Sequence, residues 1–244
     1  VQDVAWLTDR EKALVQQEIH REEAQKAAQA PSSQSASGAA FFRSPVVWYF
    51  GICSFCLEMG EFAVGFWAPT IIQGFGFDDS RTIGLLSAIP FVCAGFVMIL
   101  AGKSADRRGE RRWHLIIPLG ASISGLVMAA SFSHSPFLAM CGLTLAATGA
   151  LTSIPMFWPL PTALLSTSLA AGGLALINTI GNLAGFFGNA LIGGVKDATG
   201  STDIGLYMVA GFVLVSALMV LRIPASRVNT TPAPEERQAA GAAS

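Results

Sequence analysis

The chain has 244 residues, of which 52% are hydrophobic and only 13% are charged. An ordinary soluble domain carries about 25% charged residues, so this composition excludes a typical soluble globular protein and indicates a protein built for a lipid bilayer. The formal net charge of −1 provides no basic field for nucleic acid, which is therefore excluded as a partner.

The first 44 residues are polar, and we interpret them as a cytoplasmic linker. Thr8 and Glu11 have the spacing of a capping box, which predicts a solvated helix from near Asp9. Residues 31–38, rich in Ser, Ala and Gly, are typical of a flexible segment. Because the chain begins at Val1 and opens with polar residues, we expect a fragment of a longer protein without a signal peptide.

Six long apolar runs follow, and about 20 helical residues are enough to cross a hydrocarbon core of about 30 Å. The sequence therefore predicts an all-α membrane protein, with a bundle of six transmembrane helices over residues 45–223. A disordered cytoplasmic tail is expected at 224–244. The predicted spans are 46–72, 82–102, 113–132, 136–156, 170–195 and 204–222.

The basic residues predict the orientation of these spans. If both termini and the loop at 103–112 lie inside, that side holds 13 of the 15 Lys and Arg residues, and only Arg81 and Lys196 lie outside. Cytoplasmic loops retain positive charge. We therefore expect a multi-pass protein of the inner (plasma) membrane with both termini in the cytoplasm.

Polar residues of the first span recur at steps of three and four, which places them on one helix face. They are Gly51, Ser54, Glu58, Glu61 and Gly65. Glu58 and Glu61 are the charged residues expected near mid-membrane, where acids are costly and usually functional. We interpret them as proton-coupling candidates. The alternative is a protonated glutamate that is hydrogen-bonded inside the bundle.

Three asparagines of the fifth span, Asn178, Asn182 and Asn189, also share one face. Their amides suit hydrogen bonding to the hydroxyls or carboxylates of a ligand, although bonding between helices remains an alternative for Asn182 and Asn189. We interpret a neighbouring face of small residues as a packing surface, made by Gly181, Gly185 and Gly188.

Signals for enzymatic chemistry are weak. Cys53 and Cys56 have the spacing of a redox or metal motif but lie in an apolar run without a second ligand pair. His114 and His134 are isolated in sequence, and we find no set of Ser, His and Asp and no nucleotide fingerprint. We therefore expect no catalytic residues, no metal and no cofactor. A six-span membrane-embedded enzyme, or a structural or regulatory membrane protein, remains the alternative to a transporter.

The most specific motif lies between the second and third predicted spans. It reads Gly102-Lys-Ser-Ala-Asp106-Arg107-Arg108-Gly109-Glu110-Arg111-Arg112. In it, Asp106 can cap the next helix or pair with an arginine, and Gly109 permits a tight reversal. This order resembles the loop signature of the major facilitator superfamily. The resemblance implies a gating loop formed by Gly102, Asp106, Arg107, Gly109, Arg111 and Arg112.

Further stretches resemble the anion:cation symporter branch of that superfamily. They include residues 66–72, 84–90, 175–182 and 196–200. The resemblance implies that the chain is the C-terminal half of a twelve-helix fold, and that its partner is the missing N-terminal six-helix half. It further implies proton-coupled uptake of a small organic anion, such as a carboxylate or sugar acid, by alternating access.

The resemblance also implies substrate-binding roles for Trp158 and Asn178. Ser54 and Asn182 are the further candidates. Trp158 lies in the stretch from Pro155 to Pro161, which predicts a bend or an end of the fourth span. An interfacial anchor is an equal alternative for Trp158.

Overall fold

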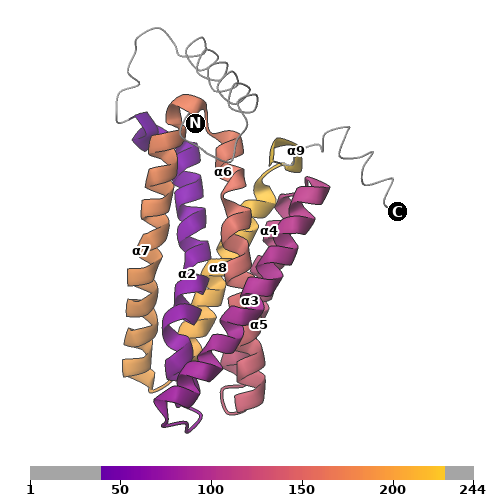
Figure 1. Ribbon diagram of the computed structural model, residues 1–244. Coiled ribbons are helices and arrows are strands. Elements are labelled where there is room, and N and C mark those ends of the chain that lie inside the picture. The colour runs from indigo at the N-terminus through magenta and orange to yellow at the C-terminus, as the bar shows by residue number, and fades with distance from the viewer. Residues whose placement is uncertain (1–39, 229–244) are drawn as a thin grey trace, which may run out of the picture. The chain divides into compact units, whose positions relative to one another are not determined.

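The computed structural model describes residues 40–228, and all of these except Ala40 belong to one compact unit (Figure 1). Helices are the only regular secondary structure of the described residues, which form no strand. The predicted helix near Asp9 and the linker at 31–38 lie outside the described range. The elements are η1 (Ala40–Arg43), α2 (Pro45–Gln73), α3 (Ser80–Arg108), α4 (Arg112–Ser131), α5 (Pro136–Phe157), α6 (Pro159–Leu164), α7 (Thr167–Thr199), α8 (Asp203–Arg222) and α9 (Ala225–Val228).

Six helices in the described part of the chain are long and apolar enough to cross a membrane, which confirms the predicted fold class. Helices α5 and α6 together form the fourth of them. A bend or an end was predicted in the stretch from Pro155 to Pro161, and α5 ends there at Phe157, with α6 beginning at Pro159. Helix α9 corrects the prediction of a disordered tail at 224–244, because it lies inside that range and its Val228 is buried.

Glycines bring α4 and α5 into close contact. A Cβ atom added at Gly142 would lie 2.5 Å from the amide nitrogen of Ala129, and one added at Gly125 would lie 2.6 Å from the carbonyl oxygen of Gly142. At Gly149, an added Cβ would lie 2.8 Å from the Cα of Ser122. Small residues allow helix backbones to approach in a membrane, where lipid provides no hydrophobic driving force between helices. The α4–α5 pair is therefore packed backbone to backbone.

Helix α2 is the central element and packs against α7, α8 and α5. In its most apolar stretch 61% of the residues are buried, against 22% in α7 and 11% in α3. The open faces of α3 and α7 carry large apolar side chains, including Leu85, Phe96 and Phe186. These two helices thus leave apolar surface for lipid or for another bundle.

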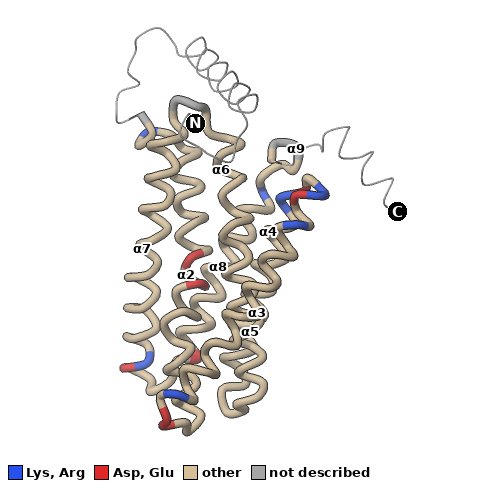
Figure 2. The backbone as a smooth tube through the Cα atoms, viewed as in Figure 1, with Lys and Arg blue, Asp and Glu red and all other residues tan. Residues whose placement is uncertain are grey.

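The charged residues gather at the two ends of the helices (Figure 2). The exception is the middle of α2, which holds Glu58 and Glu61. Among the described spans, this is the place where carboxylates lie far from both helix ends, so it is where the functional site must first be sought.

Candidate functional site

Ser54 and Glu58 form a buried polar pair on α2. They lie one helical turn apart, and the Ser54 hydroxyl donates to Glu58 Oε1 over 2.7 Å. Ser54 is 1% exposed and Glu58 is 9% exposed. The hydroxyl satisfies one oxygen of the carboxyl group, which is needed because an unsatisfied polar group inside a bundle is costly. Glu61, one turn further along, is only half-buried.

The backbone of α7 covers this pair at Gly181. A Cβ atom added there would lie 2.6 Å from Ser54 Oγ and 2.7 Å from Glu58 Cδ. Its neighbours on the same face also contact α2, since added Cβ atoms would meet Phe62 at Gly185 and Met59 at Gly188. The predicted packing role of this glycine face is confirmed, and the face also forms one wall of the Ser54–Glu58 site.

The asparagines of α7 separate into two environments. Asn189 is half-buried, accepts a hydrogen bond from Trp67 Nε1 over 3.0 Å and donates to the carbonyl of Gly185 over 2.6 Å. Asn178 and Asn182 are exposed, and Asn182 Nδ2 donates to the carbonyl of Asn178 over 2.8 Å. The helix-bonding alternative therefore holds for Asn189, whereas Asn178 and Asn182 present their side chains outside the bundle.

Asn189→Ala is expected to lower the stability of the bundle by about 0.6 kcal/mol, a typical value for a hydrogen bond between membrane helices. Asn178→Ala should leave stability unchanged, because the exposed side chain of Asn178 joins no second helix. Thermal unfolding of both purified variants in the same detergent measures the difference. Equal melting temperatures for the two variants would contradict the assignment of Asn189.

Trp158 lies at the junction of α5 and α6, away from the Ser54–Glu58 pair in chain position. Its ring packs edge-on against Phe157 at a centroid distance of 5.7 Å, and Phe157 in turn contacts Phe50 of α2. The half-buried indole thus packs on the core cluster. No described contact brings Trp158 to Asn178, so these two predicted ligand residues do not meet within this bundle.

The predicted gating loop is mostly helical, which corrects its placement between the spans. Helix α3 continues through Gly102 and Asp106 to Arg108, and the αL conformation of Gly109 (φ 62°) ends it. This reversal was predicted for Gly109. Arg111 lies in the short connection, and Arg112 begins α4 and donates to the carbonyl of Leu221 over 2.5 Å. Asp106 and Arg107 are exposed in the last turn of α3.

Glu110, and not Asp106, caps α4. Glu110 Oε1 accepts from the amide of Trp113 over 2.8 Å, and Oε2 accepts from the amide of His114 over 3.3 Å. The sequence signal for this role was an acidic residue just before the first turn of a helix, where free amides and the helix dipole favour a carboxylate.

His114 joins the ends of α3 and α4 in a chain of hydrogen bonds. Its Nδ1 lies 2.9 Å from Glu110 Oε2, and its Nε2 lies 3.0 Å from Ser104 Oγ. The prediction that His114 is isolated was therefore wrong: Ser104 reaches it only after α3 ends and the chain reverses, and Glu110 lies one turn before it. Ser104, His114 and Glu110 thus connect the ends of α3 and α4. The cavity beside His114 is lined mainly by apolar residues of α3, α4 and α5.

Glu110 is expected to make stability depend on pH in the acid range. Partial burial raises the pKa of its carboxyl, but the bonds from the Trp113 amide and from His114 outweigh this, so the pKa lies below its ordinary value. A lowered pKa contributes stability above the unfolded-state pKa of about 4.3, and that contribution is lost as pH falls through the folded-state pKa.

Glu110→Ala should therefore cost about 1 kcal/mol at neutral pH and progressively less below pH of about 4. Glu110→Gln is the matched control, since it keeps an acceptor for the amides but does not titrate. Thermal unfolding between neutral and acid pH measures both variants. A constant difference between Glu110→Ala and the parent chain across this range would show that Glu110 does not act through its charge.

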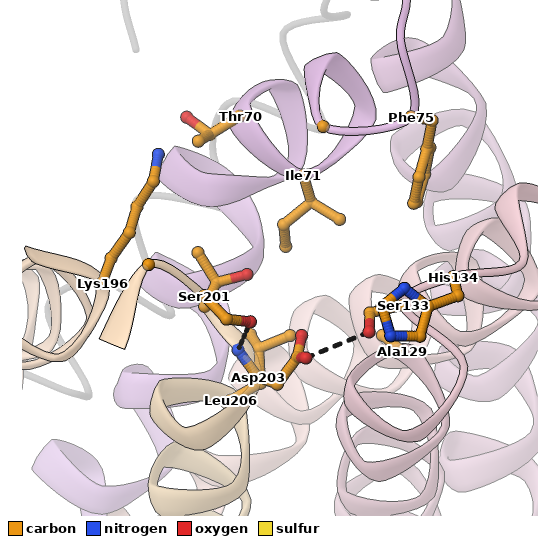
Figure 3. A pocket seen from close by; sticks show the side chains of 13 residues that line it. Thr70, Ile71, Phe75, Ala129, Ser133, His134, Lys196, Ser201, Asp203 and Leu206 are labelled. Carbon is orange, nitrogen blue, oxygen red and sulfur yellow. Dashed lines mark hydrogen bonds between the residues drawn. The ribbon is translucent and has the colours of Figure 1, made fainter. Parts of the chain in front are cut away.

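A polar pocket of about 490 Å³ lies at the C-terminal end of α2 (Figure 3). His134 and Ser133 from the α4–α5 connection, Lys196 of α7 and Asp203 of α8 line it. The Ser133 hydroxyl donates to Asp203 Oδ2 over 3.0 Å, and Lys196 Nζ lies 5.6 Å from the centre of the Trp67 ring. None of the predicted substrate-binding or proton-coupling residues lines this pocket.

Comparison with known proteins decides the family. Residues 4–189, which are more than half of the chain, match the sequence profile of the Major Facilitator Superfamily. The chain belongs to this superfamily. Membership places it among multi-pass membrane transporters and not among enzymes, so the predicted resemblance is confirmed and the enzyme alternative is set aside.

Individual relatives are named as transporters. The chain is 34% identical over 230 residues to a putative metabolite transport protein, NicT, of Pseudomonas putida, covering 93% of this chain and 51% of the relative. It is 36% identical over 216 residues to a putative tartrate transporter of Agrobacterium vitis (88% and 46%). It is 28% identical over 221 residues to a quinolone resistance transporter of Acinetobacter baumannii (90% and 49%). The chain thus spans about half the length of the curated relatives it matches.

Proposed function

We propose that this chain is the C-terminal half of a proton-coupled secondary transporter that takes up a small organic anion by alternating access. The observation that carries the proposal is the buried Ser54–Glu58 pair, with Glu61 one turn away, in a superfamily bundle whose other charges lie at the helix ends. An acid held between helices at this depth is the type of group that binds and releases a coupling proton.

The substrate class is supported by the relatives and by the chemistry of the bundle. The relatives include putative tartrate transporters, whose named substrate is a hydroxylated dicarboxylate. Asn178 and Asn182 offer amides on the exposed side of α7, where they can bond the hydroxyls and carboxylates of such a ligand. Because Lys and Arg lie only toward the ends of the described spans, the cation that neutralises an anion is supplied by the N-terminal half.

That half is the partner that covers the open faces of α3 and α7. In the proposed assembly, the two six-helix bundles rock against each other around a site near the membrane midplane. The placement of 13 of the 15 Lys and Arg residues on one side supports an inner-membrane protein with both termini in the cytoplasm.

Residues 1–244 alone are expected to show no saturable uptake in proteoliposomes. A single bundle leaves the exposed asparagines and the half-buried Glu61 without a facing wall, so it cannot enclose a water-filled path. The assay is uptake of radiolabelled tartrate driven by an imposed pH gradient, with the twelve-helix protein as the positive control. Saturable, gradient-driven uptake by residues 1–244 alone would refute the proposed need for a second half.

A further inference from the structure

Gly181 differs from the other glycines of α7 in what it contacts. The atoms nearest to its added Cβ belong to the carboxyl group of Glu58 and the hydroxyl of Ser54. At Gly185 the nearest atoms are carbons of the Phe62 ring, and at Gly194 no atom lies within 4 Å. Gly181 is thus the position where the backbone of α7 lies directly on the polar pair.

This contact shields the carboxyl group on the α7 side. The Ser54 hydroxyl already bonds Glu58 Oε1, and the α7 backbone excludes lipid and water from the same side of the pair. A side chain at position 181 would either displace the carboxyl group or move α7 away, because a Cβ atom at under 3 Å from a neighbour is not tolerated in a packed core. The atoms that a larger residue at position 181 would displace are thus those of the polar pair, and not the backbone of α2.

Within the described residues, Glu58 forms no ion pair that would hold its carboxyl group in place of the Ser54 bond. Among the described spans, Glu61 is the only other carboxyl far from the helix ends, and the nearest charged residue on α7, Lys196, is about four turns from Gly181. The remaining titratable or charged groups on the helices that pack against α2 are Tyr49, Cys53 and Cys56 of α2 itself, Arg81, Cys93, Lys103, Asp106, Arg107 and Arg108 of α3, Arg112 and His114 of α4, Cys141 of α5, Asp197 of α7, and Asp203, Tyr207 and Arg222 of α8.

We propose that Gly181 is a positioning residue for Glu58: α7 closes over the carboxyl group at this glycine, and Glu58 exchanges its proton with water only when α7 separates from α2. This inference rests on the proposed function for its role in transport. The cover itself is a property of this chain and can be tested without any transport assay.

The test is modification of Glu58 by dicyclohexylcarbodiimide, which adds to a protonated carboxyl group in apolar surroundings. Residues 1–244 in lipid nanodiscs are reacted over a range of pH, and the modified peptide is quantified by mass spectrometry. Gly181→Ala should react about tenfold faster than the parent chain, because the added methyl group holds α7 away from the carboxyl. Glu58→Gln should abolish the modification, which assigns the signal.

Two matched variants separate positioning from packing. Gly185→Ala places the same methyl group against α2 at the Phe62 ring, and Gly194→Ala adds it where there is open space. Both are expected to react at close to the parent rate. If Gly181→Ala reacts no faster than Gly185→Ala, the contact is ordinary packing and the proposal is overturned.

A second measurement applies if Gly181→Ala does not fold. The variant that combines Gly181→Ala with Glu58→Ala and Ser54→Ala removes both side-chain groups that the methyl group would strike, so it should regain a monodisperse, folded bundle. Failure of this combined variant would overturn the proposal, since the clash would then not involve the polar pair. If these results hold but Glu58→Gln in the twelve-helix protein retains proton-driven uptake, the coupling role fails while the positioning role of Gly181 stands.

Discussion

Gly149→Leu is expected to abolish the folded bundle. The Cβ atom alone would strike backbone atoms of α4, including the carbonyl oxygen of Pro118 and the amide and Cα of Ser122. Backbone atoms cannot rotate away as a side chain can, so α4 and α5 must separate along their length. Overpacking a core typically costs about 1–3 kcal/mol of folding free energy. We expect this substitution to exceed that range because the atoms in its way belong to the backbone of α4.

The measurement is the yield and melting profile of purified residues 1–244 carrying Gly149→Leu. Gly120→Leu is the matched control, because Gly120 is on α4, is exposed and has no atom within 4 Å of an added Cβ. The control should express and melt like the parent chain. Similar profiles for the two leucine variants would contradict the close approach of α4 and α5 at Gly149.

Glu58→Gln in the twelve-helix protein is expected to eliminate proton-driven uptake while substrate counterflow survives. Glutamine has nearly the same shape, can still accept from the Ser54 hydroxyl and fits beneath Gly181, but it cannot bind and release a proton. Exchange of labelled for unlabelled substrate requires only the alternation of access, so it does not need the proton carrier.

Glu61→Gln is the companion variant, and a smaller effect is expected because Glu61 is only half-buried and lies outside the Ser54 hydrogen bond. Both activities are measured in the same proteoliposomes, with and without an imposed pH gradient. If both glutamine variants keep the parent protein's dependence on the gradient, neither carboxyl carries the coupling proton, and the proposed coupling site is wrong.

The sequence alone was sufficient for the class of the protein and for its transmembrane helices. The reason is that the bilayer requires about 20 apolar residues per span and internal hydrogen bonding of every backbone group, and both are local properties of the chain. The prediction that Gly109 reverses the chain was likewise correct, because a left-handed backbone position strongly favours glycine.

Contacts between helices were decided by the tertiary structure. Residue spacing placed Ser54 and Glu58 on one face of their helix but did not indicate that Gly181 lies over them. Spacing also could not distinguish Asn189, which bonds Trp67, from the exposed Asn178 and Asn182. A helical pattern gives the angle of a side chain around its own axis and says nothing about which helix lies opposite.

The connection between α3 and α4 shows the same division. Its composition identified the motif, but the extension of α3 to Arg108 and the capping of α4 by Glu110 depend on where the chain leaves one helix and enters the next. The bond of His114 to Ser104 forms only when the ends of α3 and α4 are brought together, whereas its bond to Glu110 is local to the start of α4. Residues that are distant on separate helices meet through packing, and packing depends on the shape of all the helices at once, so these contacts cannot be obtained from any single segment of the sequence.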